Sequence, residues 1–480
     1  MKEFKYYMAA LFLTLFIAGP LFAQNEKVAA YSVERAAFSE RGYDEYAPVL
    51  YQNSIVFSAN KRMNVLRKYD GDKGKPPWNI FRVVDEGDGE WSRVEVFSED
   101  LRTVTYDGPV TFNSQGNRIY FNRNYDPDNR KVKSKVGIFF AEYSNGSWTG
   151  IQPFPHNDPS YNLFHPTLSQ DGMKLYFASD MPGGEGQFDL YVCTFERGDW
   201  SEPVNLGPQV NSRKNEIYPS IHENGRLFFS TNGWGGVGGY DIFFTEEVNE
   251  AWISPVHLPE PFNSKRQDAT LISDPGLTAG YITSNRDRWS NSIYEFQSVV
   301  PEFQDCEFQD QDSYCFVFFE TGTMDIDTTN FMYEWTINNK VKIRGKEAPY
   351  CFDGPGDFTA RLDVLDMLTG AVLFNEADYE FSITDKVHIG APDTVVVNQA
   401  IELDGSKTYM QQFNADRFYW DTGDYARPTG TRASHYYYKP GIYTIQLGVT
   451  ENPGRVEITQ KACTTKKIVV LPEPSLAGTN

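Results

Sequence analysis

The chain has 480 residues, a formal net charge of −21 and an aromatic content of 15%. So negative a protein is repelled by phosphate backbones, which argues against a nucleic-acid partner. Five cysteines are too few for a disulfide scaffold of this length. Many glycines and prolines between short alternating runs predict an all-β protein of two or more domains.

The first 23 residues have the pattern of a cleavable signal peptide. Lys2 and Lys5 precede an apolar run from Met8 to Phe22, and Ala23 is a small residue suited to signal peptidase. The alternative, an uncleaved anchor helix, needs about 20 apolar residues. No later segment of the sequence is long and apolar enough to span a bilayer. We therefore expect an exported mature chain that begins near residue 24 and has no transmembrane segment.

A repeat of about 52 residues runs from residue 44 to residue 297. A triplet of any residue, Ile or Leu, and an aromatic recurs at 79–81, 137–139, 189–191, 241–243 and 292–294, and a tryptophan follows the first four. Within a unit, two alternating runs are joined by a turn such as Asp171-Gly172, and two more strands follow. Four antiparallel strands per repeat are typical of a propeller blade. The sequence predicts a β-propeller within residues 24–300, of five blades, with six as the alternative.

The fifth unit lacks both the tryptophan and the fourth strand. A proline opens each of the first four units, 18 or 19 residues after the preceding tryptophan, and the same count back from Pro48 reaches Ala30. We expect residues 30–38 to supply the missing outer strand of the last blade, which would remove an exposed edge and close the ring. The alternative, unrelated hairpins in a sandwich, does not explain five matches in step.

Units three and four resemble a known repeat. The residues that carry the likeness are 175–179 (LYFAS), 182–184 (PGG), 188–191 (FDLY), 200–207 (WSEPVNLG) and 210–212 (VNS). They are similar to the WD40-like repeat of TolB-type periplasmic propellers, in the version found in envelope proteins of gliding and type IX secreting bacteria. The resemblance implies a place in the periplasm or at the outer-membrane periphery, with the cell surface as an alternative, and a role near secretion or gliding machinery.

Two sandwich domains are expected after residue 300. Residues 386–473 resemble a PKD domain, a small immunoglobulin-like sandwich, through Trp420-Asp421-Thr422-Gly423-Asp424 and the alternating run at 442–447; the family pattern has Phe where Thr422 stands. Trp420 would then be the buried core aromatic. Residues 303–384 follow the same plan faintly, with Trp335 on the tryptophan strand, and we expect a degenerate PKD-like sandwich there. Such modules act as spacers and as protein or glycan contacts, and some bind calcium.

Four acids occupy matching places in the repeats: Glu45, Asp107, Glu216 and Asp268 each stand two or three residues before the opening position of their blade. The innermost strand begins there, so these side chains would ring one axial mouth of the propeller and hold a cation or a basic peptide tail. The alternative is that they cap the loops between blades.

Asp404, Asp421 and Asp424 are candidate calcium ligands, because carboxylates in sandwich loops suit a hard cation. The alternative is that they stabilise turns. No other cofactor is indicated. In the oxidising compartment, Cys306, Cys315 and Cys351 are expected to include one disulfide, with the pairing open and at least one thiol left over.

Catalytic motifs such as Gly-x-Ser-x-Gly and His-Glu-x-x-His are missing from the sequence. The Gly-rich loops at 183–186 and 235–239 precede strands rather than helices, so they are not phosphate cradles. We therefore expect a non-catalytic scaffold that binds envelope proteins. The alternative is a surface carbohydrate-binding or hydrolase-accessory protein, in which Tyr425, Tyr436 and Tyr438 would stack on sugars.

Overall fold

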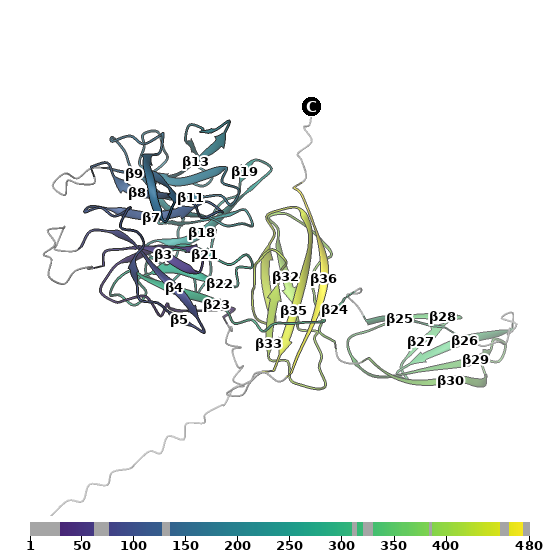
Figure 1. Ribbon diagram of the computed structural model, residues 1–480. Helices are drawn as coiled ribbons and strands as arrows, with labels where there is room; N and C mark the ends of the chain where they lie inside the picture. Colours follow the sequence, from purple (N-terminus) through teal and green to yellow (C-terminus); the bar gives the residue numbers. More distant parts are fainter. Residues whose placement is uncertain are drawn as a thin grey trace, which may run out of the picture.

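The computed structural model describes residues 29–61, 76–126, 135–309, 314–319, 330–383, 386–451 and 460–473. Their regular structure is β throughout, which confirms the predicted all-β class (Figure 1). Within these ranges no helix has the length and apolar character needed to cross a membrane. The predicted signal peptide, residues 1–23, lies outside the described residues.

Between residues 31 and 298 the strands form five antiparallel sheets (Figure 1). The first contains β2 (Glu45–Tyr51), β3 (Ser54–Ala59), β4 (Asn79–Gly87), β5 (Glu90–Trp91) and β6 (Glu95–Val96). The second contains β7 (Asp107–Phe112), β8 (Arg118–Asn124), β9 (Val136–Ser144) and β10 (Ser147–Pro153). The third contains β11 (Leu163–Leu168), β12 (Lys174–Ser179), β13 (Asp189–Glu196), β14 (Asp199–Trp200) and β15 (Val204–Asn205). The fourth contains β16 (Glu216–Ile221), β17 (Arg226–Thr231), β18 (Asp241–Val248), β19 (Ala251–Trp252) and β20 (Val256–His257). The fifth contains β21 (Asp268–Ser273), β22 (Ala279–Ser284), β23 (Ser292–Ser298) and β1 (Tyr31–Arg35).

The first strands of the five sheets surround a common axis. β2 contacts β7, β7 contacts β11, β11 contacts β16, β16 contacts β21, and β21 contacts β2 again. This cyclic order is the arrangement of a β-propeller. The outer strand of the fifth sheet comes from the other end of this region, because β1 pairs antiparallel with β23, from Tyr31 opposite Ser298 to Arg35 opposite Tyr294. The pairing continues in the next residues, where the Ala36 N–H donates to the Ile293 carbonyl (3.0 Å).

The propeller core lies between neighbouring sheets. Each hydrophobic cluster joins residues of two of them; Ile138 of the second sheet, for example, packs with Phe177 and Tyr191 of the third. The tryptophans that follow the first four repeat triplets pack at these seams, as Trp148 does at 5% exposure. The repeat period therefore reflects one blade and one seam.

Two sandwiches follow the propeller. The first has β25 (Tyr314–Phe319), β26 (Phe331–Ile337), β27 (Val341–Arg344), β28 (Glu347–Phe352), β29 (Gly356–Asp366) and β30 (Val372–Ile383). The second has β24 (Glu307–Phe308), β31 (Thr394–Val396), β32 (Ala400–Asp404), β33 (Arg417–Asp421), β34 (Arg432–Tyr436), β35 (Gly441–Thr450) and β36 (Lys461–Leu471). Trp335 and Trp420 are the largest buried side chains of the two cores, at 2% and 1% exposure.

The predicted boundary at residue 303 needs correction. β24 pairs in parallel with β36, and Cys306 of the same segment forms a disulfide with Cys463. The Gln309 amide nitrogen also donates to the Ile389 carbonyl (2.9 Å). Residues 303–309 therefore belong to the second sandwich, and the first sandwich is inserted between β24 and β31. In Figure 1 it lies on the side of the second sandwich that is remote from the propeller.

The cysteine pairing extends the expectation of one bridge. Cys315 and Cys351 are disulfide-bonded within the first sandwich, whereas Cys306 reaches Cys463 across 157 residues of sequence. Cys193 is a free, buried thiol in the third sheet.

Candidate functional site: the axial face of the propeller

The end of the propeller at which the innermost strands begin is called the axial face here. Glu45, Asp107, Glu216 and Asp268 are the first residues of β2, β7, β16 and β21, so they occupy equivalent places around this face. Their exposed fractions, however, are 0–1%. Each backbone N–H donates to a carbonyl of the preceding sheet, as Asp268 does to Tyr240 (2.8 Å) and Glu216 to Phe188 (2.7 Å).

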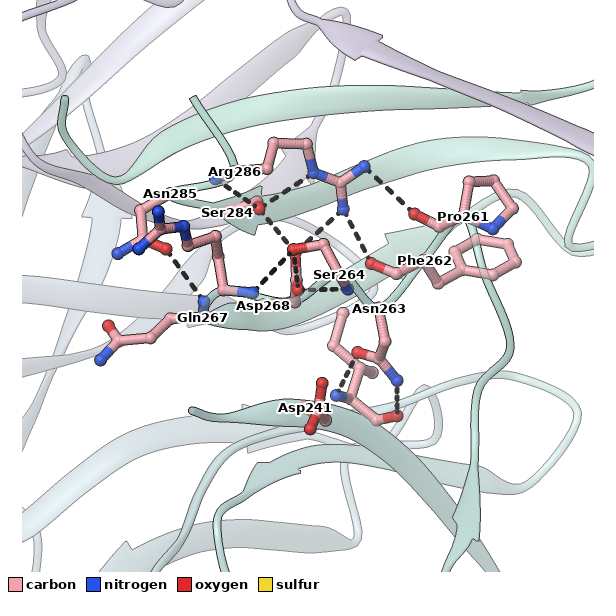
Figure 2. A network of polar contacts seen from close by, with 12 residues as sticks. Asp241, Pro261, Phe262, Asn263, Ser264, Gln267, Asp268, Ser284, Asn285 and Arg286 are labelled. Carbon is pink, nitrogen blue, oxygen red and sulfur yellow. Dashed lines mark hydrogen bonds and ion pairs between the residues drawn. The ribbon is translucent and has the colours of Figure 1, made fainter. Parts of the chain in front are cut away.

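Asp268 shows how such a carboxylate is occupied (Figure 2). One oxygen accepts hydrogen bonds from the backbone N–H and the hydroxyl of Ser264, both at 2.7 Å. The other accepts from the Ser284 hydroxyl (2.5 Å) and from Nη2 of Arg286 (2.9 Å). Arg286 also donates to the carbonyls of Pro261 and Phe262. No side of this carboxylate is left for a ligand.

The other three acids follow the same scheme. Asp107 accepts from the N–H and hydroxyl of Thr103 and from Nε of Arg123 (3.0 Å). Glu216 accepts from Ser212 and from the Thr231 hydroxyl (2.7 Å). Burial raises the pKa of the Asp107 and Glu216 carboxyls, and hydrogen bonds oppose that rise.

Glu45, like Glu216, forms no ion pair with an arginine among the described residues. It accepts from the Ser39 hydroxyl (2.5 Å) and the Glu40 N–H (3.2 Å), and the Ser39 hydroxyl oxygen in turn accepts from the Ile293 N–H (3.2 Å). Burial raises the pKa of Glu45 to about 7, against the opposing effect of these hydrogen bonds. Glu45 thus joins the first sheet to the segment that follows the closing strand.

These contacts favour the loop-capping alternative over an acidic binding ring. The carboxylates accept hydrogen bonds from loop amides, hydroxyl groups and arginines of the chain itself. In addition, the third sheet begins with Leu163, so the acids do not form a complete ring. The acids position loops and do not present charge to a partner.

An aromatic stack occupies the axis at this face. Tyr46 of the first sheet stacks on Tyr218 of the fourth, with ring centroids 5.6 Å apart and planes at 4°, and Tyr218 stacks on His165 of the third at 3.7 Å. Trp78 contacts Tyr46 and Tyr106 at the other end of the stack. These partly exposed rings come from four sheets and close the axis with a mainly apolar surface.

A cavity of about 40 Å³ lies beneath the stack, lined by Pro48, Pro109, Pro166 and Pro219 and by the residues beside them. The residue before each of these prolines has a positive φ. Examples are His165 (57°) and Tyr218 (52°), and the strand register shifts at both positions. Such non-glycine conformations cost about 1 kcal/mol or more each and persist only where packing imposes them. Nδ1 of His165 accepts from the Tyr218 N–H (3.2 Å), and burial lowers the pKa of His165 to about 3, so the ring is neutral.

The three candidate calcium ligands do not converge. Asp404 pairs with Arg432 (3.1 Å) and Asp421 lies 3.7 Å from Arg427. In the part of the chain that the structure describes, no group of three or more His, Cys, Asp or Glu side chains is placed to hold a metal ion. The calcium hypothesis is therefore not supported by the geometry, since cations of the protein already face these acids.

Asp424 serves a different purpose, which the sequence did not indicate. It lies 3.2 Å from His435 and 3.7 Å from Nη2 of Arg226, a propeller residue of β17. The guanidinium of Arg226 also lies 4.4 Å from the ring centroid of Phe244. The pKa of Asp424 is lowered, because the hydrogen bond and charge of His435 outweigh burial.

Arg427 forms a second docking contact between the sandwich and the propeller. It donates to the Tyr31 hydroxyl (2.9 Å) and to the carbonyls of Leu277 (3.3 Å) and Gly276 (3.0 Å). Both contacts involve the ends of sheets opposite the axial face, since Arg226 and Leu277 adjoin the turns after the innermost strands. The second sandwich therefore leaves the axial face uncovered.

Comparison with known proteins identifies this sandwich. Residues 385–465 match the PKD domain family. A 76-residue stretch of the chain is 30% identical to Collagenase ColA of Clostridium perfringens, and it covers 16% of this chain but only 7% of the collagenase. The match therefore spans only a small part of the length of the collagenase.

Solved structures to which the chain shows some similarity include TolB from Agrobacterium tumefaciens and endo-arabinase from Bacteroides thetaiotaomicron VPI-5482. TolB is 13% identical, with a TM-score of 0.32 over 71% of this chain and 82% of that chain. The endo-arabinase is 11% identical, with a TM-score of 0.34 over 57% of this chain and 99% of that chain. At these values the similarities do not bear on activity.

Proposed function

We propose that the chain is a non-catalytic scaffold of the cell envelope that binds protein partners through a five-bladed propeller, closed by residues 30–38 and followed by two PKD-type sandwiches. The observation that carries this proposal is the occupancy of the axial acids. A hydrolase built on this axis would need carboxylates open to substrate, whereas Glu45, Asp107, Glu216 and Asp268 are buried and hydrogen-bonded within the chain. What remains accessible is a broad rigid surface, and rigid surfaces bind with little ordering cost.

Its proposed location is the periplasm or the outer-membrane periphery, with a role near secretion or gliding machinery. The signal-peptide pattern and the repeat likeness of the sequence support this location.

The test is affinity purification of the full-length mature chain from crosslinked envelopes, followed by mass spectrometry. We expect one or a few envelope proteins to be recovered reproducibly. Recovery of none, or hydrolysis of glycans or peptides by the purified protein, would contradict the proposal.

A second candidate function, glycan binding by the PKD domain, is favoured by the exposure of Tyr425 (40%) and Tyr436 (44%). Tyr438 does not share this role, because it packs against Phe244 of the propeller (6.3 Å between centroids). Glycan array binding that is lost in the Tyr425→Ala/Tyr436→Ala variant would support this function.

A further inference from the structure

The exposed charge in the turns that precede Glu216 and Asp268 is positive. The turns at 212–216 (SRKNE) and 264–268 (SKRQD) share one pattern, in which the final acid accepts from the N–H and hydroxyl of the initial serine. The serine hydroxyl oxygen in turn accepts an N–H from the residue two places further on, at 3.1 and 3.2 Å. The four basic side chains of these turns are exposed: Arg213, Lys214, Lys265 and Arg266. The buried acids therefore hold two basic pairs toward solvent.

The two turns belong to one continuous surface. Nζ of Lys214 donates to the Asn232 carbonyl (3.0 Å) at the start of the loop 232–240, and the Gly239 N–H at its end donates to the Arg266 carbonyl (2.8 Å). The next loop, 285–291, adjoins the second turn, because the Asn285 N–H donates to the Gln267 carbonyl (3.1 Å).

These two loops add apolar and basic side chains. In the loop 232–240, Trp234 is 36% and Val237 50% exposed, and in the loop 285–291 Trp289 is 78% exposed next to the exposed Arg288. The basic arc is defined here as Arg213, Lys214, Lys265, Arg266, Arg288, Trp234, Val237 and Trp289.

The cations of the arc have no acidic partner in the part of the chain that the structure describes. Among the described residues none of the five forms an ion pair, although elsewhere on the propeller Arg82 pairs with Glu95 (2.6 Å) and Arg118 with Glu142 (2.5 Å). The acid in the loop 285–291, Asp287, is taken by Arg35 of the closing strand. Five exposed cations without an ion pair among the described residues thus lie together on one side of the axial face of a chain whose net charge is −21.

We propose that the basic arc binds an acidic segment of a partner protein, with Trp234 and Trp289 packing on apolar side chains of that segment. This inference rests on the proposed scaffold function and names the chemistry of its partner. Tryptophan and arginine are the residues most often dominant in protein interfaces. An extended polyanion is disfavoured because the net negative charge of the chain repels it. A short acidic segment stays within the ~10 Å over which the charges of the arc remain unscreened at about 0.1 M salt.

The test compares two variants with the same charge change. The arc variant carries Arg213→Glu, Lys214→Glu, Lys265→Glu and Arg266→Glu; the control carries Arg93→Glu, Lys340→Glu, Lys346→Glu and Lys407→Glu, at exposed sites that form no ion pair among the described residues. The probe is a fluorescent glutamate-rich peptide with interspersed leucines. Four exposed charge pairs account for roughly a tenfold or greater loss of affinity in the arc variant, and we expect no loss beyond about twofold in the control.

Several results would overturn the proposal: equal loss in both variants, equally tight binding of a peptide with glutamine in place of glutamate, or arc-dependent binding of phosphatidylglycerol vesicles without peptide binding. Unchanged melting of the arc variant verifies its fold; if it fails to fold, Trp289→Ala replaces it, with an expected loss of several-fold. Recovery of partner proteins from crosslinked envelopes distinguishes the arc proposal from the scaffold proposal. Equal partner recovery by the arc variant and the wild type overturns the arc alone, and no recovery by either overturns the scaffold function beneath it.

Discussion

Replacing Asp268 with alanine should destabilise the propeller through one buried ion pair. The carboxylate is 0% exposed and holds Ser264, Ser284 and Arg286, so the substitution leaves the Arg286 guanidinium, 19% exposed, without its counterion. Breaking a buried pair costs about 3–5 kcal/mol. Because Arg286 keeps its bonds to Pro261 and Phe262, we expect the lower end, about 3 kcal/mol.

A loss of about 3 kcal/mol corresponds to a fall in Tm of roughly 8 °C for a domain of more than 200 residues. Calorimetry of the full-length mature chain would measure it.

Two matched variants separate charge from shape: Asp268→Asn keeps the acceptors for Ser264 but removes the charge that Arg286 needs, and Glu216→Gln removes a charge that no arginine faces. We expect the Asn variant to lose about half as much as the Ala variant, and the Gln variant less than about 1 kcal/mol. Melting of Asp268→Ala within about 2 °C of wild type, or greater loss in Glu216→Gln than in Asp268→Asn, would refute the capping role.

Three further predictions concern a buried carboxyl group, the contact between the propeller and the PKD domain, and a disulfide. Wild-type stability should fall as pH rises from 4.5 toward 7, because the folded state keeps the Glu45 proton that the unfolded state releases. Glu45→Gln should reduce this slope, and a slope in urea midpoints that the substitution leaves unchanged would contradict the assignment. Arg427→Ala should free the PKD domain from Tyr31 and shift small-angle scattering toward a broader distribution of shapes; an unchanged profile would show that other contacts suffice. Cys306→Ser/Cys463→Ser should lower the stability of the PKD domain by about 3 kcal/mol or more, because the bridge closes a long loop, and a smaller loss in calorimetry would indicate that β24 pairing holds the segment alone.

The propeller could be predicted from the sequence because each blade repeats the same packing problem. Each seam contains the aromatic of a repeat triplet on a third strand, and four of the five seams also contain the tryptophan that follows it. The spacing of about 52 residues records both. The absence of Trp in the fifth unit pointed to an outer strand from elsewhere, and β1 stands at that position in the structure. Regular spacing is thus informative wherever the same contact recurs.

The burial and hydrogen-bond partners of a side chain are not marked by a regular spacing in the sequence. Glu45, Asp107, Glu216 and Asp268 were placed at the right ends of the right strands, but their burial also depends on partners such as Ser284 and Arg286, which recur at no fixed spacing in the sequence. The serine four residues before Glu216 and Asp268 was the available signal.

The contacts that dock the PKD domain on the propeller also could not be predicted from the sequence. It depends on Arg226 and Arg427 meeting partners 150 or more residues away in the sequence. The insertion of the first sandwich follows from pairing across a similar distance, between β24 and β36. These contacts are not part of the repeat, so no periodicity in the sequence reveals them.

The two ends of the propeller have separate tasks in the proposed scaffold. Arg427 donates to Tyr31, the first residue of the closing strand β1, so detaching β1 from β23 would also break the bond to the PKD domain. Cys306 and Cys463 in turn fasten the segment before the first sandwich to that same domain. The PKD domain therefore stabilises ring closure from the end opposite the axial face, and it does so without covering the basic arc. A partner bound at the arc would engage a surface whose geometry is already fixed, which is the condition under which a few exposed charges and two tryptophans suffice for recognition.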